Sequence, residues 1–442
     1  MNQIAGIPYV AAQFDAHGKP LNAAQVKVPP GTTDLIVVSH GWNNTAEQAE
    51  ALYRELFTNF AAVASDVVRS RKLAIIGVIW PSKRFTDVVD AAVAEHGTGA
   101  GGGVGLVDNA AAAEETIRLK LDLIGEMFGK KAAAKIKAAK AQIAKLETDP
   151  RARDKFVNEL RSLLDASEAH DEDNSKLFFR LKGSSMLERL KVPTPVVAAP
   201  PKRGGGATSL RRRGAAQPAG GAAGLGDIFS GFRSGAIRFL NYFTYYEMKK
   251  RAGTVGRNGV GPMLDRLADK VQRIHLVGHS FGGRVVTAAA AGSRTEKLRS
   301  MALLQTAFSH HGFSRSMKGF FREVVDRQRI KGPILITHTP NDRAVGVAYP
   351  AASRLSRDVS TAFGDANDKF GGIGRNGAQK METGEIVSAV NQLLPVGGKY
   401  AWKAGRLHNL ESSKFIVGVN GGDAHGAVTG KEVAWAISRA MA

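Results

Sequence analysis

One serine of the chain stands in a setting that is typical of a catalytic nucleophile. Ser280 lies in the segment GHSFG, residues 278–282, after an apolar stretch at 273–278 and before a run of small apolar residues at 284–292. The serine therefore occupies a predicted strand-to-helix turn. A nucleophile on such a turn needs a strained backbone, and the residues two positions away must be small so that strand and helix can approach each other. We predict that Ser280 is a nucleophile.

A serine hydroxyl is a poor nucleophile at neutral pH and needs a general base, which in turn needs an orienting carboxylate. Asp342 follows the apolar stretch 333–337, beyond the carboxyl end of a predicted strand, where sites form in open α/β sheets. His425 lies in a Gly-rich loop after the apolar stretch 414–419, which we expect to be the last strand. We predict that Ser280, His425 and Asp342 form a catalytic triad.

Other residues compete for the roles of base and acid. His408 is the strongest alternative to His425 among the eleven histidines, and Asp365 and Asp368 are the alternatives to Asp342. Aspartates in such loops also serve simply to form turns.

The remaining histidines carry weaker signals. His275 lies within an apolar stretch and is expected to be a packed core side chain. His279 is the variable residue of the serine turn, and its side chain is expected to point away from the neighbours of Ser280. His310 and His311 form a pair that resembles metal ligands, but no carboxylate accompanies them at a metal-binding spacing. We therefore predict neither a metal nor another cofactor.

Two backbone N–H groups are candidates for binding the oxyanion that forms when a serine attacks an acyl carbon. Phe281 directly follows Ser280 and can donate one of them. Trp42 lies in the segment SHGWNN, residues 39–44, after another apolar stretch. Gly41 permits a close turn there and leaves the N–H of Trp42 free, so we predict an oxyanion hole formed by Trp42 and Phe281. The alternative is that this segment merely ends a strand.

Short apolar stretches alternate with helical patterns over most of the chain, which predicts an α/β fold with a mostly parallel sheet and helices on both faces. The predicted strands of this sheet are residues 34–39, 73–80, 273–278, 301–306, 333–337 and 414–419. Residues 7–14 and 21–28 flank a turn-forming segment and predict an antiparallel hairpin at one edge.

The strand pattern is interrupted by a long insert. We predict that residues 1–95 and 241–442 form the core and that residues 96–240 form a helical cap. The cap carries helical patterns at 110–146, 151–169 and 176–190. A Gly- and Arg-rich segment at about 199–226 has almost no large apolar side chain and predicts a flexible linker.

Together these motifs resemble the α/β-hydrolase superfamily over about 300 residues. The resemblance is carried by the segment HGW at residues 40–42, by the turn around Ser280, and by Asp342 and His425 in the order Ser, Asp, His. Within the superfamily the chain is most similar to poorly characterised bacterial esterase- and lipase-like hydrolases that carry a Trp-Pro-Ser segment after the next strand, here residues 80–82.

The resemblance implies a serine hydrolase that cleaves a carboxylic ester through an acyl-enzyme intermediate. Lipid esters are among the carboxylic esters that such an enzyme could cleave. It implies that Ser280 attacks, that His425 acts as base and then as acid, and that Asp342 orients it. A serine at this position disfavours epoxide and haloalkane hydrolysis, for which the superfamily uses aspartate. The competing function is a non-catalytic binding protein on a hydrolase scaffold.

The charge of the chain indicates which partners either a hydrolase or a binding protein would have. The chain of 442 residues has a net charge of +21 and no cysteine, and residues 201–332 hold 24 Lys and Arg against seven Asp and Glu. Such a region attracts anionic membrane surfaces or nucleic acid, and the absence of interleaved aromatic residues disfavours nucleic acid. The chain shows neither an export leader nor a membrane-spanning stretch, which predicts a cytoplasmic protein and leaves a leaderless secretion route open.

One apolar pattern admits two interpretations. Residues 225–243 repeat Leu, Ile and Phe at helical spacing with arginines between them. A helix that lies on an anionic lipid surface and a helix that packs on the sheet both have this pattern. We favour the packed helix because the pattern continues towards the strand before Ser280.

Overall fold

The structure is a computed structural model, and it describes residues 2–82, 106–166, 169, 175–191, 231–342, 344–345, 370–418 and 422–441. The predicted linker at 199–226 and the alternative acids Asp365 and Asp368 lie outside these residues.

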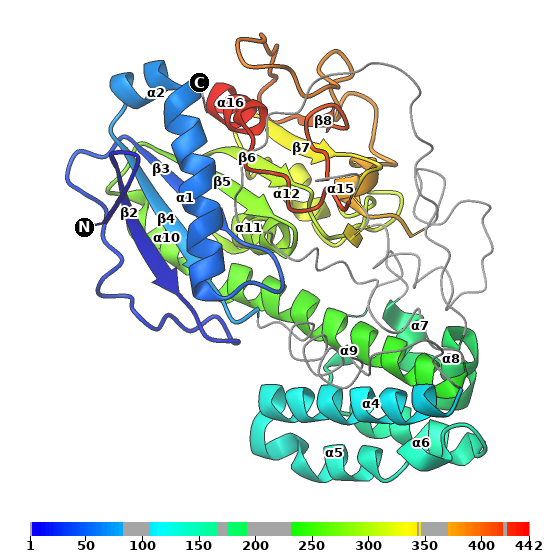
Figure 1. The fold of residues 1–442 in the computed structure, drawn as a ribbon. Helices are drawn as coiled ribbons and strands as arrows, with labels where there is room; N and C mark the ends of the chain where they lie inside the picture. Colours follow the sequence, from blue (N-terminus) through cyan, green and yellow to red (C-terminus); the bar gives the residue numbers. More distant parts are fainter. Residues whose placement is uncertain are drawn as a thin grey trace, which may run out of the picture.

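An eight-stranded sheet forms the centre of the larger part of the molecule (Figure 1). Its strand order is β1-β2-β4-β3-β5-β6-β7-β8, and every neighbouring pair except β1 and β2 is parallel. The prediction of an α/β fold with a mostly parallel sheet is confirmed. The strands are β1 (Asn2–Ile4), β2 (Ile7–Gln13), β3 (Asp34–Ser39), β4 (Leu73–Ile79), β5 (Arg273–His279), β6 (Leu298–Leu304), β7 (Ile334–His338) and β8 (Leu407–Glu411).

Helices cover both faces of the sheet because neighbouring residues of each central strand point to opposite sides. On β3, Ile36 packs in a cluster with α1 (Ala46–Val63) and α16 (Lys431–Ala440). The next residue, Val37, packs in a second cluster with α9 (Phe232–Thr254), α10 (Gly261–Ala268) and α11 (Phe281–Gly292). All six residues of β3 are buried, which explains why its sequence reads as one apolar run rather than an alternation. The other helices of this part are α2 (Ser65–Ser70), the π-helical η5 (Val255–Val260), α12 (Arg322–Asp326) and α15 (Ile373–Asn376).

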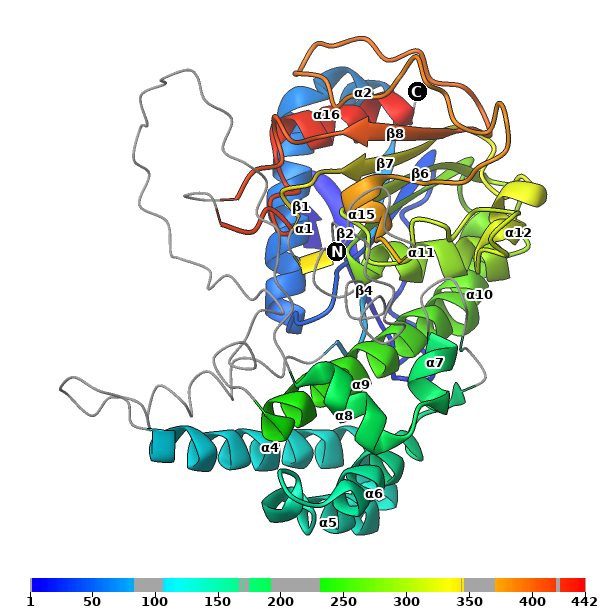
Figure 2. The same ribbon diagram turned by 90° about the vertical axis from the view of Figure 1, so that its right-hand side faces the viewer.

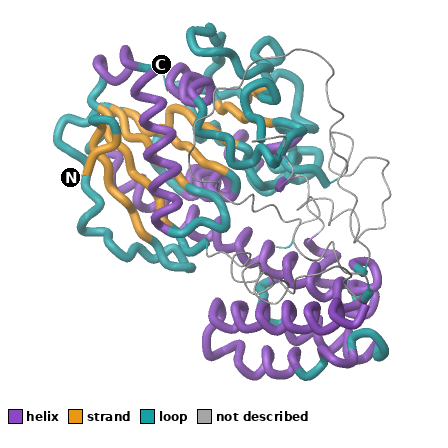
Figure 3. The backbone as a smooth tube through the Cα atoms, in the orientation of Figure 1, coloured by secondary structure: helices purple, strands orange, loops and turns teal. Residues whose placement is uncertain are grey.

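A helical part without strands among its described residues lies beyond one edge of the sheet part (Figures 2 and 3). It contains α4 (Leu106–Phe128), η1 (Gly129–Ala132), α5 (Ala133–Lys140), η2 (Ile143–Lys145), α6 (Pro150–Arg161), α7 (Ser175–Arg180) and α8 (Gly183–Leu190). The helix predicted over 110–146 is broken after Phe128, where Gly129 has a left-handed backbone with φ of 66°.

Helix α9 connects the two parts. It packs on α4 and α8 near its start and on α11 further along, so it runs without a break through residue 241, the predicted boundary of the cap. In its first half Ile237, Phe239 and Phe243 are buried, whereas Phe232 is partly buried. Over residues 232–243 this helix is packed, as we favoured, but mainly against α4 and α8 rather than against the sheet. The part of the apolar pattern at residues 225–230 lies outside the described residues. No described helix combines the length and the apolar character that a membrane span requires.

Two of the strand predictions are wrong. Residues 21–28 form no strand, and β2 instead pairs with β1 and, in parallel, with β4. The last strand is β8, whereas residues 413–416 form a turn in which the N–H groups of Phe415 and Ile416 donate to the carbonyl of Ser412. The turn contains apolar residues because the side chain of Ile416 is buried and anchors it. The neighbouring Val417 is 50 % exposed, so the apolar run does not reflect a buried strand.

Candidate active site

Ser280 occupies a sharp turn between β5 and α11. Its backbone angles, φ of 56° and ψ of −125°, are strained for a residue with a side chain. Two backbone hydrogen bonds hold the turn: the N–H of Ser280 donates to the carbonyl of Leu304 at 3.0 Å, and the N–H of Ala307 donates to the carbonyl of Ser280 at 3.1 Å. The strain is thus maintained by the end of the neighbouring strand, β6.

The glycines around the turn are required by close approaches of the backbone. A Cβ atom on Gly278 would lie 2.5 Å from the carbonyl oxygen of Gly282. A Cβ on Gly282 would overlap the carbonyl oxygen of Ser39 at the end of β3, and one on Gly283 would overlap the side chain of Thr306. The strand and the helix can meet at this angle only because these positions lack side chains.

The structure brings Ser280, His425 and Asp342 together, although up to 145 residues separate them along the chain. Nε2 of His425 lies 2.8 Å from Oγ of Ser280, and Nδ1 of His425 lies 2.9 Å from Oδ2 of Asp342. A carboxylate oxygen only accepts hydrogen bonds, so Nδ1 carries the proton and Nε2 accepts from the serine hydroxyl. The predicted base and the predicted nucleophile are therefore within hydrogen-bond distance of each other, as proton transfer between them would require.

Asp342 is fully buried in the loop after β7. Its Oδ1 accepts from the N–H of Val345 at 2.9 Å, and its Oδ2 accepts from Nε2 of Gln305 at 3.3 Å as well as from His425. Gln305 follows β6, is itself buried, and also donates to the carbonyl of Gly374 at 2.8 Å. These donors fix the direction in which the carboxylate points, and the sequence gives no separate signal for Gln305.

The charge of Asp342 determines how His425 titrates. Burial by itself lowers the pKa of His425, but the charge of Asp342 and the hydrogen bond to it outweigh burial, so the pKa is raised above its ordinary value. A histidine with this environment is a stronger base than a free imidazole, and the protonated ring that forms during proton transfer is stabilised.

We expected the side chain of His279 to point away from the neighbours of Ser280, but it contacts His425. Its Nε2 lies 2.8 Å from the carbonyl oxygen of His425, and the two imidazole rings are 4.9 Å apart. Burial and the neighbouring His425 lower the pKa of His279 to about 3. His279 is therefore a neutral hydrogen-bond donor within this site.

The loop that carries Trp42 is braced by the segment at residues 80–82. The ring of Trp80 stacks on His40 at 5.5 Å, and the backbone N–H of Trp80 donates to Nε2 of His40 at 3.3 Å. The N–H of Asn43 donates to the carbonyl of Ser82 at 2.9 Å. Burial lowers the pKa of His40 to about 4, so this brace is neutral. A loop without regular structure thereby obtains a defined shape.

This loop lies directly beside Ser280. A Cβ on Gly41 would lie 3.1 Å from Oγ of Ser280, and the rings of Trp42 and Phe281 are 6.1 Å apart. No described residue accepts a hydrogen bond from the N–H of Trp42. Phe281 is the first residue of α11, where a helix leaves N–H groups without an intrahelical acceptor. Both predicted oxyanion donors are therefore beside Ser280.

The competing histidines have other partners. His275 is buried, as expected, with Nδ1 2.8 Å from Oγ of Ser300 and Nε2 3.1 Å from Oδ1 of Asp34. His408 lies on β8, and its Nε2 accepts from the N–H of Lys403 at 3.2 Å. Within the described part of the chain, no group of three His, Asp or Glu side chains is arranged to hold a metal ion.

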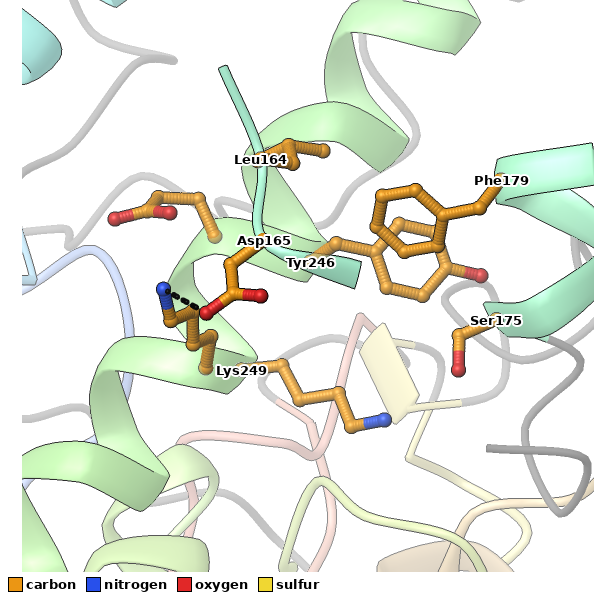
Figure 4. Close-up of a pocket in the computed structure, with 8 residues that line it drawn as sticks. Leu164, Asp165, Ser175, Phe179, Tyr246 and Lys249 are labelled. Atoms are coloured by element: carbon orange, nitrogen blue, oxygen red, sulfur yellow. Dashed lines mark ion pairs between the residues drawn. The ribbon is translucent and has the colours of Figure 1, made fainter. Parts of the chain in front are cut away.

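A pocket lies between α9 and the residues of α7 and the segment after α6, and none of the predicted site residues lines it (Figure 4). Leu164, Phe179 and Tyr246 form its apolar side, and Lys250 forms an ion pair with Asp165 at 3.0 Å. Tyr246 is adjacent to Tyr245, whose ring lies 5.3 Å from that of Phe281. Helix α9 thus contributes one ring to this pocket and the neighbouring ring to the surroundings of Phe281.

No protein-family model matches this chain, and the comparisons with curated proteins and with solved structures found no match either.

Proposed function

We propose that this protein is a serine hydrolase with an α/β-hydrolase fold that cleaves carboxylic esters through an acyl-enzyme intermediate. The observation that carries the proposal is the continuous relay from Asp342 through His425 to the strained Ser280, with distances of 2.9 and 2.8 Å. A buried carboxylate, a neutral imidazole and a hydroxyl in this order are the parts that activate a serine nucleophile.

The first half of the reaction forms an ester between substrate and enzyme. Oγ of Ser280 attacks the acyl carbon while Nε2 of His425 takes the hydroxyl proton, and Asp342 stabilises the resulting imidazolium. The carbonyl oxygen becomes an oxyanion, to which the N–H groups of Trp42 and Phe281 donate. The N-terminal end of α11 also favours negative charge at this point. The intermediate then collapses, and the leaving alcohol takes the proton from His425.

The second half releases the acid. A water molecule attacks the acyl carbon of the acyl-enzyme, and His425 takes one of its protons. The second tetrahedral intermediate collapses and expels the oxygen of Ser280, which recovers its proton from His425. The products are a carboxylic acid and the regenerated enzyme, so every proton that His425 accepts is returned within the same cycle.

The test is turnover of p-nitrophenyl esters over a series of acyl chain lengths, with and without vesicles that contain anionic lipid. We expect hydrolysis by the wild-type protein and its loss in Ser280→Ala and His425→Ala. A rate that rises at the vesicle surface for long chains would make the substrate a lipid ester, and a preference for short chains would make it a small ester. Equal turnover by wild type and Ser280→Ala would contradict the proposal.

A further inference from the structure

We propose that His279 is a positioning residue for this reaction: its Nε2–H holds the backbone of His425 so that the imidazole stays between Ser280 and Asp342. The inference rests on the proposed function for its kinetic consequence, and its structural consequence can be measured separately. It assigns a task to the residue between Gly278 and Ser280 that its place in the turn does not indicate.

The contact has a single chemical interpretation. Nε2 of His279 lies 2.8 Å from the carbonyl oxygen of His425. A carbonyl oxygen only accepts, so Nε2 carries the proton and donates it. His279 is 6 % exposed, and its pKa of about 3 keeps the ring neutral at any pH at which the triad can work. The donor is therefore always present.

His279 is unsuited to act as a second base. Its Nε2–H donates to the carbonyl of His425, so only Nδ1 has a free lone pair that could accept a proton. That atom is buried and has no hydrogen-bond partner among the described residues. The two imidazole rings, 4.9 Å apart, thus have different tasks: the His425 ring exchanges protons, and the His279 ring does not.

The hydrogen bond from His279 is one of two backbone ties that accompany the triad. The side chain of His425 forms a hydrogen bond with Ser280. The backbone carbonyl of His425 accepts a hydrogen bond from His279, the residue that precedes Ser280. Likewise the side chain of His425 bonds to Asp342, and the N–H of Ala424 donates to the carbonyl of Asn341 at 3.2 Å. The loops that carry the serine and the aspartate therefore each hold the histidine loop by its main chain.

These ties are needed because the histidine loop has little structure of its own. Residues 422–430 contain no helix or strand, and the side chain of His425 is 19 % exposed. Two further hydrogen bonds of this loop are local: the N–H of His425 donates to Oδ1 of Asp423, and that of Ala427 donates to the carbonyl of Ala424. Loss of the His279 donor would let the imidazole shift, and a shift of about 1 Å can cost roughly 100-fold in rate.

The experiment compares three substitutions of His279 with a control. Gln places an amide N–H where Nε2 was, Asn places it where Nδ1 was, and Met fills similar space without a donor. His408→Met is the control, because His408 is also a buried histidine bonded to backbone but lies on β8 outside the site. Thermal unfolding of each variant shows whether it folds, and if His279→Met does not, the Gln and Asn pair decides the question.

Two readouts are needed. We expect His279→Met and His279→Asn to lower kcat for a p-nitrophenyl ester by about 10- to 100-fold with KM changed less than about twofold, and His279→Gln and His408→Met to stay within about threefold of wild type. In proton NMR, we expect the low-field resonance of the Nδ1–H of His425 in wild type and His279→Gln, and its broadening or loss in the other two His279 variants.

The outcomes separate the two proposals. Wild-type kcat in folded His279→Met and His279→Asn would overturn the role of His279, as would equal losses in the Gln and Asn variants. If the wild-type protein hydrolyses no ester, the proposed function fails, and the NMR resonance alone then decides the role: an unchanged resonance in all variants overturns it, and selective loss supports it.

Discussion

A Cβ atom on Gly41 would lie 2.6 Å from the Cβ of Ser280, which is closer than two such atoms approach in proteins. The loop before Trp42 and Ser280 are therefore in direct contact, and the space between them admits no added methyl group.

Gly41→Ala should move either the loop or the serine. We expect kcat/KM for a p-nitrophenyl ester to fall by about tenfold or more, because the Trp42 N–H and Oγ of Ser280 can no longer both keep their places. Gly426→Ala is the matched control, since a Cβ there meets no described atom within 4 Å although it is next to His425. Equal activity of Gly41→Ala and the control would refute the contact.

Gly282→Ala tests the approach of the serine turn to β3. The added Cβ would overlap the carbonyl oxygen of Ser39, and we expect the free energy of unfolding to fall by about 1–3 kcal/mol. Gly125→Ala should do the opposite and raise it by about 0.5–1 kcal/mol, because Gly125 lies inside α4 and its Cβ would meet only Ile136 at 3.8 Å. Urea denaturation measures both, and a stable Gly282→Ala would show that the turn is looser than described.

Asp342→Asn should lower kcat roughly 10³- to 10⁴-fold, because the imidazole loses both its orientation and the charge that stabilises its protonated form. It should also shift the pH dependence. Activity requires neutral His425 and therefore rises as pH increases through its pKa, which Asp342 raises. Without that charge, burial lowers the pKa, so the acidic limb of kcat/KM moves to lower pH. A limb that stays in place would mean that another group sets it.

Buried neutral histidines should make the fold sensitive to acid. Burial lowers the pKa of His40 to about 4, of His279 to about 3 and of His311 to about 4, so between pH 6.5 and 5 the unfolded chain binds protons that the folded chain does not. Stability then falls as pH falls, by up to about 1.4 kcal/mol per pH unit for each such histidine. His425 acts in the opposite direction because its pKa is raised.

Urea unfolding at pH 7, 6 and 5 measures this slope. His311→Gln removes one titrating group away from the triad and should make the slope shallower by up to about 1.4 kcal/mol per pH unit. A slope that is the same in wild type and His311→Gln would show that this histidine does not resist protonation in the folded state.

The strands that could be predicted are those buried on both faces. Residues 34–39 and 73–79 read as unbroken apolar runs because helices cover both sides of them. The last strand, LHNLE at 407–411, could not be recognised because its buried positions include His408 and are separated by Asn409. The apolar run at 414–419 was misleading, since Ile416 anchors a turn there.

The side chains of the triad could be predicted to converge because the carboxyl ends of parallel strands meet at one edge of a sheet. Three contributions were invisible in the sequence: the donor from Gln305 to Asp342, the donor from His279 to His425, and the stacking of Trp80 on His40. Each depends on which loops face each other in space, and no local pattern of residues encodes that. The roles of the triad and of the oxyanion donors remain predictions.

The most direct measurement is covalent trapping of the nucleophile with a fluorophosphonate, which reacts with an activated serine. Mass spectrometry of the digested protein should find one phosphonylated residue, Ser280, with labelling abolished in Ser280→Ala and slowed in His425→Ala. Ser309 is another buried serine, outside the predicted triad, and Ser309→Ala should react as wild type. Modification of wild type and Ser280→Ala at equal rates, or no reaction of the folded wild-type protein at all, would contradict the account.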